Sequence, residues 1–587
     1  MKFRWLLETS QPERARHLSQ SLGISCLLAQ CLLNRGLNEE ESARRFLNPR
    51  LRDLSDPFLI PHMRTAVDRL CSARSRRESV VVFGDYDVDG ITSTALLVEG
   101  LEALGWTVHC YLPARFGEGY GLTQEAVENC LVHFPATLLV AVDCGSTSAT
   151  TIRWLRNRGT DVIVLDHHQI SDPPPPAVAL VNPLCRVERL AGVAPTDVPF
   201  SELSAAGLAF KLVHALVKRG REEQWPSAQD FDVRPLLDLA ALGTVADVVP
   251  LVRENRILVT AGLEHLNHWV RPGLKALRNV AAIEGRAGCY EIGFQLAPRL
   301  NAAGRLEHAA EALALLRAHE PGLALQLAQG LDAKNSERQS IQREMTDEAI
   351  AAVRERFCPE TDWVIVEGKE SWHIGVVGIV AARVLREFYR PTLILGGDGG
   401  EWRGSGRSIQ GFDMAAALSA CGDLLLRHGG HAMAAGISMR AQNIAPFRER
   451  LNEYARQTLR AEQLSPPLRL DANVFSGEIT LGKVEELQRL QPTGTGNPAV
   501  QLAMLGVAHQ RNPQRMGNQQ QHAKFWVGHQ EGYAIEAVWW NCGDQPLPKV
   551  RFDLAVVPEI NTFNGNRTVQ LKILDWRPAA PPSAAAS

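Results

Sequence analysis

The segment Ser79-Val-Val-Val-Phe-Gly-Asp-Tyr-Asp-Val-Asp-Gly90 joins an uninterrupted apolar run to three closely spaced aspartates. The apolar run has the length and the β-branched composition of a buried strand, and a helical pattern follows it near 92–104. The same order recurs further along the chain. Strands are predicted at 137–142 and 161–165, and helices near 122–133 and 148–158. This alternation is typical of a parallel sheet covered by helices, so it predicts an α/β domain.

Acidic and imidazole side chains follow each of these predicted strands. The three strands are followed, in order, by Asp85, Asp87 and Asp89, by Asp143, and by Asp166, His167 and His168. In open α/β sheets, functional groups gather at the carboxyl ends of the strands. We therefore expect these side chains to meet at one edge of the sheet.

The residue types in this group indicate a metal-dependent reaction. Carboxylate oxygens with one or two imidazoles suit Mg²⁺ or Mn²⁺ better than zinc, which favours thiolates or a histidine-rich set. The number of carboxylates indicates two ions rather than one. Two neighbouring ions can bind a phosphate from both sides, activate water and neutralise the leaving oxygen. Phosphodiester hydrolysis is the reaction that best uses such a site.

Each element of the pattern also has a purely structural interpretation. An Asp-x-Asp after a strand is more often a helix cap or a turn, and Asp85 fits that interpretation. A pair of histidines such as His167 and His168 is usually an ordinary hydrogen-bonded pair. The coincidence of acids and imidazoles at three strand ends favours a catalytic site over these alternatives.

The order of the motifs resembles the DHH phosphoesterase superfamily. Its members carry an Asp-x-Asp, a lone Asp after a strand, an Asp-His-His and a later Asp. The fourth motif corresponds to Ala241-Leu-Gly-Thr-Val-Ala-Asp-Val-Val-Pro250, which on its own is equally consistent with a buried helix end. Many members also have a histidine where this chain has Phe83, and Asp85 is the natural candidate for the ligand position left open.

This resemblance assigns roles to the individual residues. The metal ligands it implies are Asp87, Asp89, Asp143, His167 and Asp247, with Asp85 as the additional candidate. Asp143 is expected to bridge the two ions. Asp166 is expected to orient His167, and His168 is expected to face the phosphate as an electrostatic stabiliser or proton donor.

Further motifs extend the resemblance to nearly the whole chain. The matching segments are Gly84–Ile91, Pro113–Arg115 with Gly119–Leu122, Ala297–Arg305, Gly404–Ser408 and Gly429–His431. In order and context they are similar to the RecJ family, and the last two belong to its companion domain, DHHA1. Arginine offers paired donors to phosphate, and glycine lets backbone amides approach it closely.

The RecJ resemblance implies a set of substrate contacts. The residues expected to hold phosphates, including the 5′ end, are Arg115, Arg305, Ser405 and Arg407. Gly429, Gly430 and His431 are expected to line the wall opposite the metals. Taken singly, an arginine is more often a surface charge and Gly-Gly-His a plain turn.

The expected fold is α/β, with a parallel-sheet DHH lobe and a smaller α/β DHHA1 lobe joined by a long helix and followed by an all-β OB-like barrel. Short alternating runs after the motif Pro492-Thr-Gly-Thr-Gly-Asn-Pro498 indicate this barrel. The predicted segments are an N-terminal helical segment at 1–60, the DHH domain at 61–305, the connecting helix at 306–357, DHHA1 at 358–460, the barrel at 466–577 and a disordered tail at 578–587.

The function implied by the resemblance is single-stranded-DNA-specific exonuclease activity in the 5′-to-3′ direction, releasing 5′-mononucleotides in DNA repair and recombination. A single-strand binding protein and a helicase are the implied partners, and the chain is expected to be a monomer. The alternatives are a DHH-type phosphatase of oligonucleotides or nucleotides and a replication scaffold without catalysis. The predicted barrel favours a polymer substrate, and the complete metal motifs argue against a silent scaffold.

The composition excludes several other classes of protein. No apolar run reaches the roughly 20 residues of a membrane helix. Glu8 and Arg14 stand where a signal peptide needs its apolar core. Eleven cysteines without a Cys-x-x-Cys pair predict neither a zinc knuckle nor a disulfide framework, which fits the cytoplasm. A net charge of −3 places any DNA binding in a local groove rather than over the whole surface.

Overall fold

The computed structural model describes residues 3–114, 118–119, 121–185, 198–398, 400–529, 534–543 and 545–579. The chain forms two compact units. The parallel-sheet unit comprises Asn48–Gln339 and Pro492–Pro498, and the barrel unit comprises Met1–Leu47, Ser340–Gln491 and Ala499–Ser587. Each unit has its own architecture. Among the described residues, no helix is long and apolar enough to cross a membrane.

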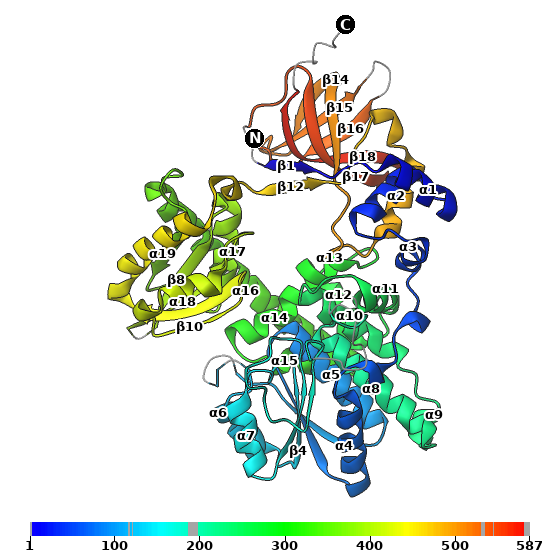
Figure 1. Ribbon diagram of the computed structural model, residues 1–587, viewed down its shortest axis with the longest axis vertical. Coiled ribbons are helices and arrows are strands. Elements are labelled where there is room, and N and C mark those ends of the chain that lie inside the picture. Colours follow the sequence, from blue (N-terminus) through cyan, green and yellow to red (C-terminus); the bar gives the residue numbers. More distant parts are fainter. Residues whose placement is uncertain are drawn as a thin grey trace. The chain divides into compact units, whose positions relative to one another are not determined.

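The parallel-sheet unit is built on five strands that all run in the same direction (Figure 1). They are β2 (Ser79–Gly84), β3 (Thr107–Tyr111), β4 (Leu138–Val142), β5 (Asp161–Leu165) and β6 (Ala179–Val181). Their order in the sheet is β3-β2-β4-β5-β6. β3 is added on one side of β2 and β4 on the other, so the topological switch point of the sheet lies between β2 and β4. The predicted parallel sheet is confirmed. The two edge strands are not predicted from the sequence, because β3 is half exposed and β6 has only three residues.

Helices cover both faces of this sheet because its strand residues are apolar on both sides. Val80 and Val82 face a core shared with α4 (Met63–Arg76), α5 (Val88–Ala103) and α8 (Ala205–Glu222). On the opposite face, Val81 and Phe83 pack with α6 (Gln124–His133) and α7 (Ala149–Asn157). Each fully buried valine contributes about 2 kcal/mol of burial free energy, which makes this sheet a rigid support for the loops at its edge.

A second group of helices completes the unit. These are α9 (Pro226–Gln229), α10 (Leu237–Ala246), α11 (Arg253–Leu266), α12 (Pro272–Val280), α13 (Cys289–Glu291), α14 (Ala297–Leu306) and α15 (Ala310–Arg317). A π-helical turn, Ile292–Leu296, leads into α14. Helix α10 packs against α5 and α8. One long helix, α16 (Pro321–Arg356), occupies most of the stretch predicted to connect the domains.

The barrel unit contains a smaller five-stranded sheet. Its strands are β7 (Ile365–Lys369), β8 (Thr392–Asp398), β9 (Glu401–Arg407), β10 (Arg427–Gly430) and β11 (Ala434–Arg440), in the order β10-β11-β9-β8-β7. Only β7 and β8 are parallel. Helices α17 (Val377–Phe388), α18 (Met414–Ala420) and α19 (Ile444–Thr458) pack on this sheet. This is the predicted smaller α/β lobe.

The C-terminal strands close into a barrel, as predicted. They are β13 (Ala472–Asn473), β14 (Leu502–Met516), β15 (His522–Gly528), β16 (Ile535–Trp539), β17 (Phe552–Phe563) and β18 (Asn566–Pro578). Their order is β13-β14-β15-β16-β18-β17, and a further pairing of β14 with β17 closes the ring. Most of the predicted C-terminal tail lies outside the described residues, which end at 579.

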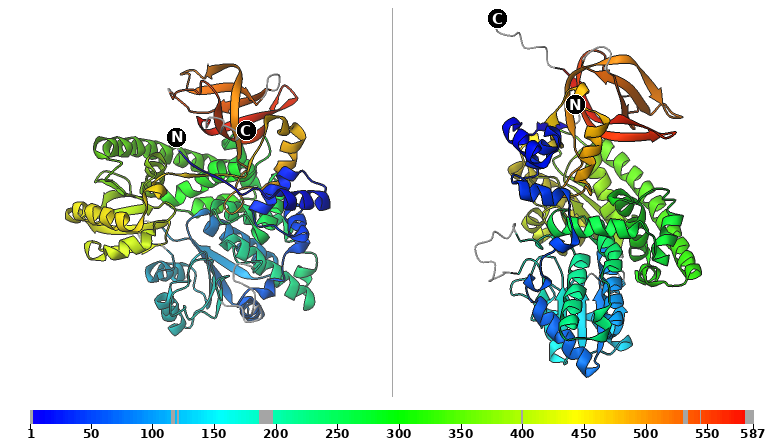
Figure 2. Two further views of the ribbon diagram at one scale, coloured as in Figure 1. Left: turned by 45° about the horizontal axis from the view of Figure 1, so that its top comes forward. Right: turned by 90° about the vertical axis from the view of Figure 1, so that its right-hand side faces the viewer.

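The N-terminal segment belongs to the same unit as this barrel. Strand β1 (Arg4–Leu7) pairs in parallel with β12 (Pro467–Leu470). Three helices follow it, α1 (Pro12–Leu22), α2 (Cys26–Asn34) and α3 (Glu40–Leu47). Buried Leu28 and Leu32 of α2 share a core with Leu487 of α20 (Leu481–Leu487) and with Phe525 of the barrel. In both views of Figure 2 the dark blue N-terminal helices lie beside α20, drawn in gold.

Candidate metal centre

The ends of β2, β4 and β5 meet at one edge of the parallel sheet, as the sequence predicts. The backbone N–H of Asp143 donates to the carbonyl of Leu165 (2.9 Å), which joins the second strand end to the third. Asp85, Asp143 and Asp166 are almost fully buried. Buried carboxylates are rare unless they are paired, hydrogen-bonded or bound to a metal.

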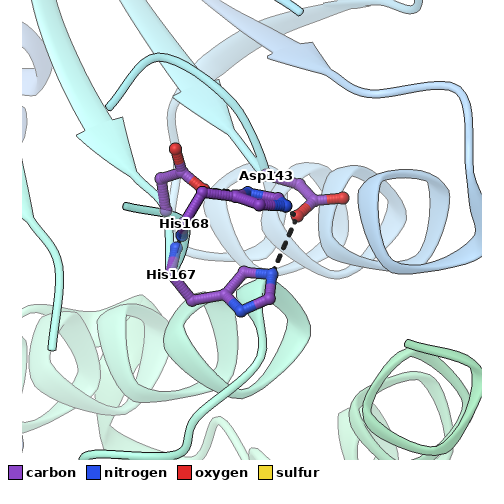
Figure 3. A group of neighbouring side chains, drawn as sticks. Asp143, His167 and His168 are labelled. Atoms are coloured by element: carbon purple, nitrogen blue, oxygen red, sulfur yellow. Dashed lines mark hydrogen bonds and ion pairs between the residues drawn. The ribbon is translucent and has the colours of Figure 1, made fainter. Parts of the chain in front are cut away.

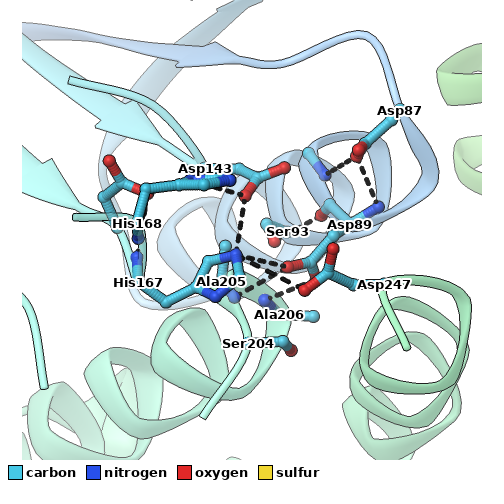
Figure 4. A network of polar contacts seen from close by, with 12 residues as sticks. Asp87, Asp89, Ser93, Asp143, His167, His168, Ser204, Ala205, Ala206 and Asp247 are labelled. Atoms are coloured by element: carbon cyan, nitrogen blue, oxygen red, sulfur yellow. Dashed lines mark hydrogen bonds and ion pairs between the residues drawn. The ribbon is translucent and has the colours of Figure 1, made fainter. Parts of the chain in front are cut away.

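His167 lies at the centre of a group of carboxylates (Figures 3 and 4). Its Nε2 atom is 3.4 Å from Asp143 Oδ1, 3.4 Å from Asp247 Oδ2 and 3.9 Å from Asp89 Oδ2. Within the described part of the chain, the buried His167 Nε2 and Asp143 Oδ1 atoms have no hydrogen-bond partner. An imidazole nitrogen and three carboxylates aimed at one point, with ligand atoms left unsatisfied, fit a divalent cation.

The potential ligands form three overlapping sets, in each of which one ligand atom per residue lies within 4.8 Å of the others. The first set contains Asp89, His167 and Asp247, and the second contains Asp85, Asp87 and Asp143. The third contains Asp143, Asp166, His167 and His168, so it shares one residue with each of the other two. Asp143 of the second set approaches His167 of the first, so it lies between them. Two sets of oxygen-rich ligands joined by a shared carboxylate have the composition of a two-ion Mg²⁺ or Mn²⁺ site.

The loop after β2 places its aspartates by ordinary helix capping. Asp87 Oδ1 accepts hydrogen bonds from the backbone N–H groups of Asp89 (3.0 Å) and Gly90 (3.1 Å), so Asp87 is the N-cap of α5. A Cβ atom on Gly90 would lie 2.5 Å from the carbonyl oxygen of Asp85, so the tight turn requires glycine. The helix cap that the sequence suggests for Asp85 is therefore formed by Asp87 instead. Asp85 points into the cluster with Asp87 and Asp143.

Asp89 is held by the first turn of α8. The N–H groups of Ala205 and Ala206 donate to its two carboxylate oxygens at 2.8 and 2.9 Å. The N-terminus of a helix favours a negative charge, and Ser204 caps this helix by accepting from Gly207 N–H (3.2 Å). Burial and the charge of Asp87 nevertheless raise the pKa of Asp89 to about 7. A cation at this point would restore its ionised form.

Asp143 has an uncommon backbone conformation. Its φ is 63°, in the left-handed region that few residues other than glycine adopt, although aspartate tolerates it better than most. Burial, followed by the charge of Asp87, raises the pKa of the Asp143 carboxyl well above its ordinary value. A strained, buried carboxylate of this kind persists where its surroundings hold it, which is typical of functional sites.

Asp166 and His168 form a hydrogen-bonded pair beside the cluster. His168 Nδ1 donates to Asp166 Oδ1 at 2.7 Å, and the Ser146 N–H donates to the other oxygen at 3.0 Å. Although burial lowers the pKa of His168, the bond to Asp166 raises it to about 9, so the ring is cationic at neutral pH. Asp166 is expected from the sequence to orient His167, but the imidazole ring that Asp166 holds is that of His168. His167 contacts Asp166 through its backbone N–H (2.8 Å).

His167 is suited to metal binding by its protonation state. Burial and the positive charge of His168 lower the pKa of His167 to about 4. The neutral imidazole offers Nε2 as a lone-pair donor, which is the form that binds metals. The two adjacent histidines therefore have opposite electrostatic character, one neutral and one cationic.

Asp247 reaches the site from a helix end rather than from a strand. It is the residue after α10, and its N–H donates to the Gly243 carbonyl (2.9 Å). Burial and the charge of Asp89 raise the pKa of Asp247 to about 9. The next residue, Val248, has φ 62°, which is rare for a β-branched side chain. The structure thus brings the fourth motif to the other three.

The expected phosphate contacts lie in both units. Arg305 is on α14 of the parallel-sheet unit, and Arg115 lies outside the described residues. In the barrel unit, Arg407 Nη1 donates to Ser405 Oγ at 2.8 Å on β9. A Cβ atom on Gly378, near the start of α17, would lie 2.9 Å from Arg407 Nη2, so this glycine leaves room for the guanidinium in its present position.

The Gly-Gly-His motif lies on the same small sheet as Ser405 and Arg407. Gly429 of β10 pairs with Gly436 of β11, which pairs with Ser405 of β9, so these residues form one row across the sheet. Gly429, Gly430 and His431 are exposed, and Gly430 has φ 138°. This row is bare backbone next to a hydroxyl group and a guanidinium, a combination that suits a phosphate chain.

Several residues that hold the site have no signal in the sequence analysis. They are Ser146, Asn182, Ser204, Ala205 and Ala206, and their contacts are made by backbone groups or small polar side chains. Asn182 Nδ2, for example, donates to the His168 carbonyl at 2.9 Å. The only local sign was the capping pattern at Ser204 before an apolar helix.

Comparisons with known proteins agree with this arrangement. The family model "DHH family, N-terminal domain" matches residues 79–244, the "DHHA1 domain" matches 361–457 and the "RecJ OB domain" matches 470–575. The single-stranded-DNA-specific exonuclease RecJ of Bacillus subtilis is 37% identical over 580 residues, covering 98% of this chain and 71% of that protein.

Two solved structures are also similar over almost the whole chain. RecJ from Thermus thermophilus in complex with Mn²⁺ has a TM-score of 0.83 and 30% identity, covering 99% of this chain and 80% of that one. The same protein in complex with Mg²⁺ has a TM-score of 0.76 and 28% identity, covering 99% and 79%. Both ions are those that the ligand set of this chain fits.

Proposed function

Because this chain belongs to the RecJ family, we propose that it hydrolyses phosphodiester bonds of single-stranded DNA as a metal-dependent exonuclease, starting at the 5′ end and releasing 5′-mononucleotides. The observation that carries the proposal is the convergence of Asp89, Asp143 and Asp247 on His167 Nε2 within 3.9 Å. A buried set of this composition has little use in an apolar core, whereas it fits the two-ion chemistry of phosphate esters.

We assign one ion to Asp89, His167 and Asp247 and the other to Asp85, Asp87 and Asp143, with Asp143 shared between them. When bound, two such ions polarise the phosphate, activate water and neutralise the leaving oxygen. The protein contributes a rigid ligand frame, because α8 holds Asp89 and the capping of α5 holds Asp87. A preorganised frame of this kind avoids rearrangement during the reaction.

His168 is the chain's own electrostatic contribution to the reaction. Its ring is held by Asp166 and is cationic at neutral pH. A fixed cation beside the ligand cluster can donate a hydrogen bond to a phosphate oxygen and stabilise the negative charge that increases in the transition state. Asp166 keeps the ring in the protonated, correctly oriented form.

The 5′ polarity and the phosphate contacts belong to the same proposal. Arg305, Ser405 and Arg407 are assigned to substrate phosphates. The exposed Gly429–His431 segment is assigned to the surface that the DNA strand contacts. Arg115 keeps its sequence-based assignment. A single-strand binding protein and a helicase are the proposed partners. The monomeric state and cytoplasmic location stay predictions from the sequence.

The alternatives make different predictions. A DHH-type phosphatase would need only the two lobes and would prefer di- or trinucleotides, whereas this chain also matches the RecJ OB domain. A scaffold without catalysis would have no use for buried ligand atoms that lack a hydrogen-bond partner, such as His167 Nε2 and Asp143 Oδ1.

One assay distinguishes these functions. Single-stranded DNA, blunt duplex DNA and single-stranded RNA, each labelled at one end, are incubated with Mn²⁺, Mg²⁺ or EDTA, and the products are separated by size. A 5′ label should appear in mononucleotides from the outset, and a 3′-labelled strand should shorten progressively. EDTA should abolish both. Cleavage confined to di- and trinucleotides would support the phosphatase, and no cleavage with either ion would support the scaffold.

A further inference from the structure

The motif Pro492-Thr-Gly-Thr-Gly-Asn-Pro498 belongs structurally to the unit that holds the metal centre. Residues on both sides of it, up to Gln491 and from Ala499, belong to the barrel unit, but the seven residues 492–498 pack with the parallel-sheet unit. A short loop that is separated in this way from its sequence neighbours is unlike an ordinary linker, which makes few contacts.

The loop holds the segment between α10 and α11, which begins directly after Asp247. The N–H of Leu251 donates to the Thr495 carbonyl at 2.7 Å. Arg256 Nη1 donates to the Pro492 carbonyl at 3.2 Å. Leu251 and Arg256 are both buried, and the Leu251 side chain packs with Ala241 of α10. The loop therefore contacts the connecting segment at Leu251 and helix α11 at Arg256.

The loop has a closed structure of its own. Gly494 and Asn497 exchange backbone hydrogen bonds of 2.8 and 3.2 Å. The fully buried Asn497 donates from Nδ2 to the Pro492 carbonyl at 2.8 Å. Gly496 has φ 73°, and a Cβ atom there would lie 2.9 Å from Pro250 Cβ. Glycine at this position thus allows both the left-handed turn and the close approach to Pro250.

The segment that the loop contacts needs external support. Val248, next to Asp247, has φ 62°, a conformation that a β-branched residue adopts only where its surroundings impose it. Leu251 is four residues after Asp247, and α11 begins at Arg253. A constraint on Leu251 therefore acts on the backbone that carries the Asp247 carboxylate, which has to stay within reach of His167.

We propose that the 492–498 loop is a positioning element of the metal centre: by holding the strained turn after Asp247, it maintains the Asp89–His167–Asp247 set and so controls its affinity for Mn²⁺ or Mg²⁺. The loop contributes no ligand and acts through Asp247. This inference rests on the proposed function, because it concerns the same metal site.

The test is Gly496→Ala in the full-length protein. The added methyl group clashes with Pro250 and disfavours the left-handed turn. Loss of a supporting contact around a metal site commonly costs about 10- to 100-fold in affinity. We therefore expect Mn²⁺ binding, measured from the EPR signal of the free ion, to weaken at least tenfold. The Mn²⁺ concentration for half-maximal cleavage should rise by the same factor, and turnover at saturating Mn²⁺ should recover.

The matched control is Gly159→Ala. Gly159 has φ 80° in the same unit, and a Cβ there meets nothing within 4 Å. It lies two residues before β5, at the opposite end of that strand from the site. It imposes a similar backbone strain away from the loop and should bind Mn²⁺ like the unaltered protein. Asn497→Ala, which removes the internal brace of the loop, is the second variant and should also weaken Mn²⁺ binding.

The outcomes separate this inference from the proposed function. Unaltered protein that binds no Mn²⁺ would overturn both. A different result would overturn only the loop's role. In that case the unaltered protein binds Mn²⁺, and the folded Gly496→Ala and Asn497→Ala proteins bind Mn²⁺ with the same affinity as the unaltered protein. Unfolding of both loop variants, judged by circular dichroism while Gly159→Ala stays folded, would also overturn it, because the loop would then govern stability rather than metal affinity.

Discussion

Gly243 provides a sensitive test of the geometry around Asp89. It lies inside α10, and a Cβ atom there would lie 2.4 Å from Thr92 Oγ1, 2.6 Å from Asp89 Oδ1 and 2.6 Å from Ala206 Cβ. The three neighbours are on α5 and α8, the helices that place and hold the Asp89 carboxylate. Gly243→Ala therefore pushes a methyl group directly against a proposed metal ligand.

The structure indicates the size of the effect. To restore an ordinary contact of 3.4 Å, Asp89 or α10 has to move by roughly 0.8 Å. Overpacking of this kind costs about 1–3 kcal/mol, and the better helix propensity of alanine offsets about 1 kcal/mol of it. We expect a net loss of about 0–2 kcal/mol in the free energy of unfolding. Because a displacement of about 1 Å at a reacting centre can cost on the order of 100-fold in rate, we expect the activity to suffer far more than the stability.

The assay compares initial rates on a labelled single-stranded oligonucleotide with Mn²⁺, and urea unfolding followed by circular dichroism. Gly330→Ala is the control, since Gly330 lies within α16 and a Cβ there meets nothing within 4 Å. It should stabilise the protein by up to about 1 kcal/mol and leave the rate unchanged. If Gly243→Ala kept more than about a tenth of the normal rate, the reasoning that Asp89 must stay within tenths of an ångström would be wrong.

Three further predictions concern the same site and its substrate. Asp143→Ala should lower turnover more than tenfold, or about 1.4 kcal/mol in barrier, with an unchanged circular dichroism spectrum; a smaller loss would contradict the bridging role. Arg407→Ala should raise KM for single-stranded DNA more than it lowers kcat, whereas a fall in kcat at constant KM would place Arg407 at the transition state. In the metal-free protein, the pKa values of Asp89 (about 7) and Asp247 (about 9) are higher than their ordinary value of 3.8. The protonated carboxyls therefore stabilise the folded state. This stabilisation is complete below pH 3.8 and is lost as the pH rises through the folded-state pKa values of about 7 and 9. The Tm in EDTA should therefore fall between pH 6 and 9 relative to the Tm in Mn²⁺, and parallel Tm curves would contradict this.

The part of the site that local sequence encodes could be predicted. Asp87, Asp143 and His167 each lie within three residues of the end of a buried apolar strand. Neighbouring parallel strands must end at the same edge, so the meeting of these residues follows from the strand pattern. Asp247 is different. It follows a helix, and only the packing of α10 against α5 and α8 brings it to the site, so its assignment depended on the family resemblance.

The parts that were missed depend on contacts between distant residues or on single hydrogen bonds. The sequence does not indicate which of two adjacent histidines Asp166 holds, because the choice depends on the turn after β5. Edge strand β3 is half exposed and lacks an apolar run. The pairing of β1 with β12 joins residues more than 450 positions apart in the sequence and has no local pattern.

These contacts between the N-terminal segment and residues beyond 466 set the order in which the molecule can be completed during synthesis. The Ser25 N–H donates to Glu486, 461 residues later, and Leu28 and Leu32 share a core with residues that follow Asn48–Gln339 of the parallel-sheet unit. At translation rates of about 5–20 residues per second, the N-terminal helices wait roughly 20–90 s for their partners. During that interval their apolar side chains lack the partners that bury them, while Asn48–Gln339 of the parallel-sheet unit has time to fold.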